Sequence, residues 1–327
     1  MSAVEPFQVR PARVRVRPGV PAAGLRRLEA AGLQPEVGTL ELAEVDALLC
    51  LLTDRLDAPL LASAPRLRIA ANMAMGTDNI DLAAARALGI AVSNTPGATT
   101  DATADLAFGL LLAAARNLIW GDRLVRAGGF TGWRPDMGLG LEMRGRTLGI
   151  VGAGRIGQAM AERARGFGLE VRFARREGGV PLPELLASAD IVSLHVPLTA
   201  ATHHLIGEAE LRRMRPHALL VNTSRGAVVD EAALVRALRE GWIAGAGLDV
   251  YEREPELAPG LAELPNVVLA PHLGSATNAT RDRMAEIAAD NIVACLAGQP
   301  LPNPVVPGRR GAGSGRGEGS GDGQGAC

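Results

Sequence analysis

Hydrophobic and polar residues alternate in short blocks along most of this chain. Apolar runs at residues 218–221, 244–248 and 267–270 are each bounded by polar residues or glycine. Runs of this length predict strands that are buried on both faces of a parallel sheet. Helical patterns lie between strands of this kind, so the chain is predicted to be an α/β protein with doubly wound parallel sheets.

The N-terminal third follows the same plan on a smaller scale. Its pattern predicts strands at residues 9–17, 47–52, 67–73 and 90–93, a helix at residues 24–32, and a helix that is capped by Asp81 and ends at Gly89. Asn94-Thr95-Pro96-Gly97 then interrupts the pattern, and a long helix rich in alanine and leucine begins near Asp101 or Thr103. These elements predict a separate small α/β domain.

The middle of the chain carries a dinucleotide fingerprint. A predicted strand at residues 147–151 runs into Gly152-Ala153-Gly154-Arg155-Ile156-Gly157, followed by a helical pattern from Gln158 that stops at residues 166–168, and then by a strand at 170–174. The motif alone is weak in a chain with 40 glycines, but this order of elements is the context it requires. Gly152 permits the tight turn, Gly154 lets the backbone approach a pyrophosphate, and Gly157 lets the helix pack on the strand.

The end of the second strand bears on the choice between the two nicotinamide cofactors. An NAD site usually places an acidic residue there to bind the ribose, whereas the 2′-phosphate of NADP requires cations. Here the strand ends in Ala174-Arg175-Arg176-Glu177. Two guanidinium groups favour NADP(H) over NAD(H). The alternative is a solvated arginine pair with Glu177 on the ribose.

Three polar side chains follow the three apolar runs of the second half. They are Arg225 in Asn222-Thr223-Ser224-Arg225-Gly226, Glu254 shortly after Leu248-Asp249-Val250, and His272 in Ala270-Pro271-His272-Leu273-Gly274. Ligands of an open α/β sheet lie beyond the carboxyl ends of its strands. A guanidinium, a carboxylate and an imidazole are therefore expected to converge on one site.

Composition excludes several other classes of protein. The chain has 327 residues with 47% hydrophobic and 21% charged residues, and its net charge of −1 gives no electrostatic case for binding nucleic acid. All 34 basic residues are arginine, which excludes a lysine Schiff base and a Walker lysine. The longest apolar stretch, residues 106–115, is too short to span a membrane, and no secretory signal is visible, so the cytoplasm is expected. Three scattered cysteines predict neither disulfides nor a metal site.

Taken together, these motifs resemble those of the D-isomer-specific 2-hydroxyacid dehydrogenases over residues 10–307, and most closely the glyoxylate/hydroxypyruvate reductases. The closer resemblance is carried by residues 72–81, by Asn94-Thr95-Pro96-Gly97 with residues 100–105, and by residues 271–277. It implies a substrate domain of residues 1–97 plus 284–307, with its last helix at about 283–298, and a dinucleotide-binding domain of residues 98–283 inserted into it. Residues 308–327, rich in glycine, are expected to form a disordered tail.

The residue types and this resemblance together imply the chemistry of the site. His272 would be the general acid, because an imidazole titrates near working pH. By analogy with the family, Glu254 would hold its other ring nitrogen and favour the imidazolium. Arg225 would bind the carboxylate and carbonyl oxygen of a 2-oxo acid, and the backbone N–H groups of Met75 and Gly76 would bind the carboxylate.

The remaining expectations concern the cofactor, the other histidines and assembly. Together with the fingerprint, the resemblance places the cofactor against Thr103, Gly152, Gly154, Arg155, Ile156, Gly157, Arg175, Arg176, Val196, Pro197, Thr202, Thr223, Ser224, Asp249, His272 and Gly274. His195 is expected to fix the cofactor-lining loop, and the other histidines have no metal-ligand company. The apolar helix at residues 103–115, with Trp120 and Trp133 downstream, and the resemblance itself imply a homodimer. Trp133 and Met137 could equally be ordinary packing.

The fold alone is compatible with other functions. The same fold serves dinucleotide-sensing proteins that bind partners with little turnover, because fold does not fix function. Phosphoglycerate and phosphite dehydrogenases are further alternatives within the family, although phosphite dehydrogenases have a lysine at the position of Met75. Formate dehydrogenases have a glutamine where Glu254 stands. The intact set of Arg225, Glu254 and His272 favours an enzyme that transfers hydride between a nicotinamide cofactor and a 2-oxo acid.

Overall fold

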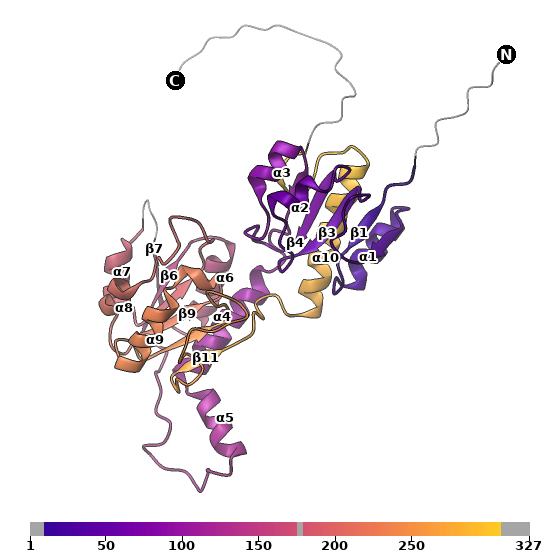
Figure 1. The fold of residues 1–327 in the computed structure, drawn as a ribbon. Helices are drawn as coiled ribbons and strands as arrows, with labels where there is room; N and C mark the ends of the chain where they lie inside the picture. The colour runs from indigo at the N-terminus through magenta and orange to yellow at the C-terminus, as the bar shows by residue number, and fades with distance from the viewer. Residues whose placement is uncertain (1–9, 175–178, 309–327) are drawn as a thin grey trace, which may run out of the picture. The chain divides into compact units, whose positions relative to one another are not determined.

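The computed structural model describes residues 10–174 and 179–308. The chain divides into two compact units, one formed by residues up to Asn94 together with those from Glu286 onward, and the other by Thr95–Ala285. Each unit has its own six-stranded sheet with helices packed against it (Figure 1). The prediction of two α/β domains with doubly wound sheets is confirmed.

The sheet of the first unit has the order β12-β5-β4-β3-β1-β2. Its strands are β1 (Val14–Val16), β2 (Pro35–Val37), β3 (Ala47–Leu51), β4 (Ile69–Met73), β5 (Ala91–Ser93) and β12 (Pro304–Val306). Its helices are α1 (Ala22–Ala30), α2 (Ala58–Ala62), α3 (Leu82–Leu88) and the later part of α10 (Asn278–Leu296). Five strands are parallel, but β12 pairs antiparallel with β5 at the edge. The parallel pattern predicted for this sheet therefore fails at β12, an antiparallel edge strand of a kind common on such sheets.

Helix ends in this unit follow the capping residues where these are strong. The Asp81 carboxylate accepts the N–H of Ala84 at the start of α3, and Gly89 ends the helix in the left-handed conformation, as predicted. The predicted start of α10, which lies in the second unit, was wrong by five residues. This helix begins at Asn278 rather than 283 because the Thr277 hydroxyl accepts the Thr280 N–H at 3.1 Å.

The sheet of the second unit is parallel throughout, in the order β11-β10-β9-β8-β6-β7. Its strands are β6 (Thr147–Val151), β7 (Glu170–Ala174), β8 (Ile191–Leu194), β9 (Leu219–Asn222), β10 (Gly245–Leu248) and β11 (Val267–Leu269). Its helices are α4 (Thr100–Ala115), α5 (Leu118–Arg126), α6 (Arg155–Gly166), α7 (Leu182–Ser188), α8 (Glu208–Arg213) and α9 (Glu231–Glu240), with a 3₁₀ turn η1 (Gly226–Val228).

Two apolar layers cover the faces of this second sheet. Side chains alternate along β9, so Leu219 and Val221 join a core with α4 and α6, whereas Leu220 joins a core with α7, α8 and α9. Both faces of this sheet are thus covered by apolar side chains and shielded from solvent. This explains why its strands appear in the sequence as unbroken apolar runs.

The order of the strands fixes the place of the site. The strand β6 lies between β7 and β8, so the chain reverses its direction of travel across the sheet at β6. The loops after β6 and β8 therefore leave on opposite sides, and ligands of such sheets bind in the crevice between them. A Cβ on Gly152, directly after β6, would contact the carbonyl oxygen of His195, directly after β8. The two loops therefore approach one another closely at the switch point.

Helix α4 and the segment after it differ in burial. Apolar side chains of α4, including Phe108, Leu110 and Leu111, are buried within their own unit, which accounts for the apolar character of residues 103–115 without a second chain. Most of the large exposed apolar side chains lie further on, in α5 and the segment beyond it, which extend away from the sheet (Figure 1). They are Leu118, Ile119, Trp120, Val125, Phe130, Trp133 and Leu139.

No single helix in the described ranges has the length and apolar character needed to cross a membrane. Helices α4 and α5 meet that requirement only as a pair, with a bend of 65° between them.

Candidate active site

The turn after β6 has the backbone that the fingerprint requires. Gly152 has φ +105°, which an L side chain rarely adopts, and a Cβ on Gly157 would contact the carbonyl oxygen of Gly152. A Cβ on Gly154, in contrast, would meet nothing within 4 Å. Two glycines thus let helix and strand pack closely, and the third leaves the backbone open on the side where a ligand approaches.

The residues at this turn fit a dinucleotide. Helix α6 begins at Arg155, and its N-cap residue, Gly154, has no side chain to satisfy the first N–H groups of the helix. Such N–H groups bind a pyrophosphate together with the helix dipole. Across the sheet, the Thr223 hydroxyl is buried and has no hydrogen-bond partner among the described residues. An unsatisfied buried hydroxyl in a predicted cofactor site is consistent with a polar ligand there.

The loop after β8 is held by its own side chains. Thr202 Oγ1 donates to the carbonyl of Pro197 at 2.6 Å and accepts the N–H of Thr199 at 2.8 Å. His195 lies 2.9 Å from the Ser193 hydroxyl through Nε2, and burial lowers the pKa of His195 to about 4. This imidazole is therefore neutral at physiological pH, and its contact is with a residue of β8.

The predicted determinants of cofactor preference lie beyond the end of β7. That strand ends at Ala174, as the sequence pattern predicted. Arg175, Arg176 and Glu177 lie outside the described residues.

Arg225 stands in a turn at the carboxyl end of β9. Asn222, the last residue of that strand, accepts the N–H and the hydroxyl of Ser224 through Oδ1 and donates to the carbonyl of Arg225 at 2.9 Å. A Cβ on Gly226 would collide with the backbone of Tyr251 and its neighbour. Only glycine therefore allows the loop after β9 to lie directly on the loop after β10.

Glu254 is held in the loop after β10. Its Oε1 accepts the N–H of Tyr251 at 3.1 Å, and the Tyr251 hydroxyl donates to the carbonyl of Ala270 at 2.9 Å. Burial and nearby carboxylates raise the pKa of Tyr251 to about 12, so this phenol remains a donor at physiological pH. The two hydrogen bonds connect the loop after β10 to the end of β11.

His272 follows β11 in an unusual backbone conformation. Its φ is +55°, in the left-handed region, and Asp249 makes three hydrogen bonds to the turn. The backbone carbonyl of Asp249 accepts the His272 N–H at 2.9 Å, and the two carboxylate oxygens accept the N–H groups of Leu273 at 2.6 Å and Gly274 at 2.8 Å. Thr103, in α4, donates to the Gly274 carbonyl at 3.0 Å. Asp249 thus shapes the histidine turn, a role that its predicted cofactor contact did not include.

His272 and Glu254, for which the sequence predicted a contact, are within hydrogen-bond distance of one another. His272 Nδ1 lies 2.9 Å from Glu254 Oε2, and the imidazole is partly buried. Burial favours the neutral carboxylic acid, but the hydrogen bond and charge of His272, the Tyr251 N–H and the charge of Arg225 lower the pKa of Glu254 below its ordinary value. Glu254 is therefore an anion at working pH. It occupies Nδ1, which leaves Nε2 as the ring atom that can meet a substrate.

The structure of the turn gives a first testable prediction. In Asp249→Asn, the amide group can accept only one of the two N–H bonds and turns a donor toward the other, so we expect the His272 turn to shift. The free energy of unfolding should fall by about 1–3 kcal/mol, because a buried donor is left unsatisfied. Chemical denaturation would measure this, with Asp230→Asn as the control, because the partly buried Asp230 carboxylate at the N-cap of α9 accepts a single backbone N–H, which an asparagine can also accept. Unchanged stability and turnover in Asp249→Asn would contradict this role.

The loop that the sequence predicted to bind the substrate lies in the first unit, after β4. Met75 is exposed and Gly76 is partly exposed. Their carbonyl groups accept hydrogen bonds from Asn94 at 2.8 Å and from Asn72 at 3.0 Å, respectively. Neither asparagine was assigned a role from sequence, although both lie within the motifs that carry the family resemblance.

A further group of polar residues beside the pair was not predicted. Glu231 and Glu252 accept each other's backbone N–H groups at 3.2 and 3.3 Å, and His204 Nε2 lies 3.2 Å from Glu252 Oε1. Burial raises the pKa of Glu231 above its ordinary value. No sequence signal marked these residues, because nothing in the local pattern shows that the start of α9 meets the loop after β10.

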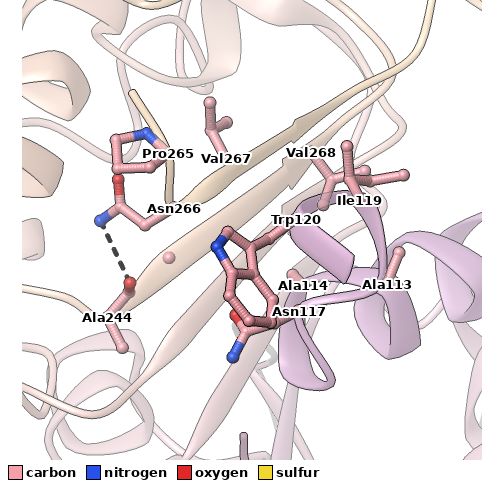
Figure 2. A pocket seen from close by; sticks show the side chains of 11 residues that line it. Ala113, Ala114, Asn117, Ile119, Trp120, Ala244, Pro265, Asn266, Val267 and Val268 are labelled. Carbon is pink, nitrogen blue, oxygen red and sulfur yellow. Dashed lines mark hydrogen bonds between the residues drawn. The ribbon is translucent and has the colours of Figure 1, made fainter. Parts of the chain in front are cut away.

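Two other features lie apart from this site. A small pocket at the opposite, amino-terminal edge of β10 and β11 is lined by Asn117, Trp120 and Asn266 together with short apolar side chains (Figure 2). Within residues 10–174 and 179–308, no cluster of three or more histidine, cysteine or acidic side chains could hold a metal ion.

The sequence of this chain is similar to those of known dehydrogenases. The NAD-binding domain of the D-isomer-specific 2-hydroxyacid dehydrogenases matches residues 108–274. A glyoxylate reductase of Thermococcus litoralis is 54% identical over 275 residues, which cover 80% of this chain and 83% of that protein. A glyoxylate reductase of Korarchaeum cryptofilum is 54% identical over 274 residues, which cover 80% and 82%.

A solved structure shares the whole architecture. The NADPH-dependent glyoxylate/hydroxypyruvate reductase of Sinorhizobium meliloti, in complex with NADP and malonate, superposes with a TM-score of 0.82 at 36% identity, covering 92% of this chain and 99% of that one. The glycine-rich turn at the switch point of a doubly wound sheet, together with the matching NAD-binding domain, indicates a nicotinamide-dinucleotide oxidoreductase. The chain belongs to the D-isomer-specific 2-hydroxyacid dehydrogenase family and is an enzyme acting on the CH–OH group of its substrates.

Proposed function

We propose that this enzyme reduces glyoxylate to glycolate, or hydroxypyruvate to the corresponding D-2-hydroxy acid. We propose further that it prefers NADPH to NADH as the hydride donor. The observation that carries the proposal is the His272–Glu254 pair at 2.9 Å beside the loop that holds Arg225. The relatives named as glyoxylate reductases and the NADP complex of the Sinorhizobium enzyme support the choice of substrate and cofactor.

Each residue of the site has a defined task in this proposal. The bound cofactor supplies the hydride to the carbonyl carbon, whose oxygen gains negative charge. Arg225 stabilises that charge and binds the substrate carboxylate, because a guanidinium stays protonated and presents paired donors. His272 donates its Nε2 proton to the oxygen, and Glu254 holds Nδ1 and stabilises the protonated ring. Met75 and Gly76 bind the carboxylate through backbone N–H groups.

The cofactor is held by three sets of residues in this proposal. Gly152, Gly154, Arg155, Ile156 and Gly157 would contact the pyrophosphate, and Arg175 and Arg176 the 2′-phosphate. The loops after β8, β9 and β10, with Val196, Pro197, Thr202, Thr223, Ser224 and Asp249, would line the nicotinamide half, beside Thr103, His272 and Gly274.

Steady-state assays test the reaction and the cofactor together. Purified enzyme is assayed with glyoxylate, hydroxypyruvate, pyruvate and phenylpyruvate, each with NADPH and NADH. We expect glyoxylate or hydroxypyruvate to give the highest kcat/KM, and NADPH to exceed NADH. The double variant Arg175→Ala/Arg176→Ala should lower the NADPH to NADH ratio by about tenfold or more, because two charge-assisted contacts are lost.

Each part of this proposal can fail separately. A higher kcat/KM with NADH than with NADPH would refute the cofactor preference alone. A lack of reduction of any 2-oxo acid with either cofactor, in protein that still binds them, would favour a dinucleotide-binding protein with little turnover.

We also propose that the enzyme is a homodimer that buries α5 and the segment after it. Trp133 is 78% exposed, Leu139 73% and Val125 61%, and such a concentration of apolar surface on one projecting segment is typical of an interface. Trp120, which lines the pocket of Figure 2, belongs to the same segment.

Light scattering tests this assembly. We expect a dimer at micromolar concentration, and a shift toward monomer in Trp133→Glu and Val125→Glu, because each places a charge in the apolar contact. Leu88→Glu is the matched control, since Leu88 is a 41% exposed leucine on α3 of the first unit. A monomeric parent enzyme, or equal effects of all three changes, would exclude this interface.

A further inference from the structure

The substrate loop after β4 is held by two side-chain amides. Asn94 Nδ2 donates to the carbonyl of Met75 at 2.8 Å, and Asn72 Nδ2 donates to the carbonyl of Gly76 at 3.0 Å. Asn72 is in β4 and Asn94 directly follows β5, and these strands are neighbours in the sheet. Two successive peptide groups of the loop are therefore fixed from two different strands.

Fixing a carbonyl also fixes the N–H group of the same peptide unit. A trans peptide is planar, and its C=O and N–H bonds point in opposite directions. The contact at the Met75 carbonyl therefore turns the Gly76 N–H away from Asn94, and the contact at the Gly76 carbonyl turns the Thr77 N–H away from Asn72. Successive backbone N–H groups can bind an anion where they point to the same side of a turn.

The Asn72 side chain is held in place by burial and by several hydrogen bonds. Its side chain is buried, and its Nδ2 also donates to Asn79 Oδ1 at 3.0 Å, so both of its donor hydrogens are used. Its Oδ1 accepts from Asn79 Nδ2 at 3.4 Å and lies 3.6 Å from the Cys50 thiol. Burial raises the pKa of that thiol, which keeps it a donor.

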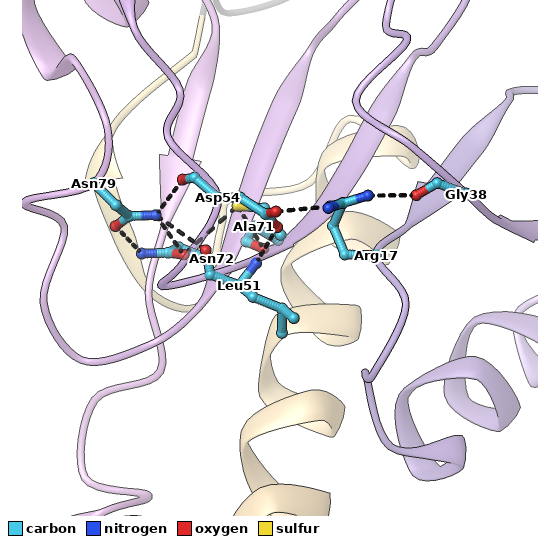
Figure 3. A network of polar contacts seen from close by, with 8 residues as sticks. Arg17, Gly38, Leu51, Asp54, Ala71, Asn72 and Asn79 are labelled. Atoms are coloured by element: carbon cyan, nitrogen blue, oxygen red, sulfur yellow. Dashed lines mark hydrogen bonds and ion pairs between the residues drawn. The ribbon is translucent and has the colours of Figure 1, made fainter. Parts of the chain in front are cut away.

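The neighbouring residues hold Asn79 in turn. Its Nδ2 donates to the carbonyls of Leu51 and Asp54 at 3.1 and 3.0 Å, and the Asp54 carboxylate accepts from Arg17 Nε at 2.8 Å. Figure 3 shows Asn72 and Asn79 pointing toward one another, with Asp54 and Arg17 continuing the network across the strands. These hydrogen bonds connect residues of the sheet and its loops to one another. The Asn72 contact with the Gly76 carbonyl extends them to the loop after β4.

We propose that Asn72 and Asn94 are positioning residues that orient the N–H groups of Gly76 and Thr77 toward the carboxylate of the 2-oxo acid. The inference rests on the proposed function, which assigns this loop to the substrate carboxylate. To the N–H groups of Met75 and Gly76 in the proposed function, this inference adds the N–H group of Thr77. It also adds two asparagines that set the direction of these donors without contacting the substrate.

The test compares substrate binding with turnover. Asn94→Ala removes one amide at a partly exposed position, so folding should be retained. We expect KM for glyoxylate to rise by about tenfold, the effect of a weakened hydrogen bond to a charged group, with kcat within about twofold and NADPH affinity unchanged. Inhibition by oxalate should weaken by a similar factor. Asn72→Ala should act in the same direction but also lower the melting temperature, because Asn72 is buried.

A neutral substrate and a matched variant separate positioning from general damage. Methyl glyoxylate lacks the carboxylate anion, so Asn94→Ala should lower its kcat/KM much less than that of glyoxylate. Asn303→Ala removes another side-chain amide contact of the first unit, the one that Asn303 makes with Asn291, and should leave both substrates unaffected.

The outcomes distinguish this inference from the proposed function. An unchanged glyoxylate KM in both asparagine variants, or an equal loss with the ester, would overturn the positioning role. If the parent enzyme reduces no 2-oxo acid, the proposed function fails before any variant is compared.

Discussion

Replacing His272 by asparagine should lower kcat for glyoxylate reduction by about 10²–10⁴-fold, the usual contribution of a positioned general acid. Asparagine cannot deliver a proton at neutral pH, although it tolerates the left-handed backbone at this position. NADPH affinity should change little, because the phosphate turn after β6 is untouched. His203→Asn is the control, since His203 is exposed and outside the site. Near-normal turnover in His272→Asn would mean that the proton comes from another group or from water.

The companion change at Glu254 tests the charge of the pair. Reduction needs the protonated imidazole, so the rate should fall on the alkaline side of the pH profile. In Glu254→Gln that alkaline limb of kcat/KM should move to lower pH, because the protonated ring loses the anion at 2.9 Å. The carboxylate is present across this range, since its pKa lies below its ordinary value. An unshifted profile would show that Glu254 only orients the ring.

Arg225→Gln should lower kcat/KM by about 10²–10³-fold, because truncating one partner of a desolvated charge pair costs about 2–5 kcal/mol. Arg225→Lys keeps the charge but loses the paired donors, so its loss should be intermediate. The same assay applied to Arg213→Gln, on the exposed surface of α8, controls for loss of a cation. Retention of kcat/KM within a few-fold in Arg225→Gln would remove this residue from the site.

The parts of the site that sequence predicted are those carried by strand ends. Arg225, Glu254 and His272 follow apolar runs that became β9, β10 and β11, and parallel strands bring their carboxyl ends to one edge. The capping residues Asp81 and Gly89 likewise marked the ends of α3, because their conformational preferences are local.

The residues that sequence missed act across distances that a local pattern does not encode. Asp249 was assigned to the cofactor, yet its three contacts with residues 272–274 depend on how β10 pairs with β11. The two asparagines that hold the substrate loop also depend on strand pairing. The start of α10 and the antiparallel β12 were missed because a weak cap and a three-residue edge strand leave little periodic signal.

At position 272 the residue that the proposed activity needs differs from the residue that the backbone conformation favours. The activity needs histidine, whereas the left-handed conformation favours glycine. A non-glycine residue in this region carries a conformational cost of about 1–2 kcal/mol, which the three contacts from Asp249 offset. Glycine would relieve that cost and remove the proton donor. Selection for thermostability alone would therefore be expected to erode catalysis here, so libraries screened for heat resistance should be screened for turnover at the same time.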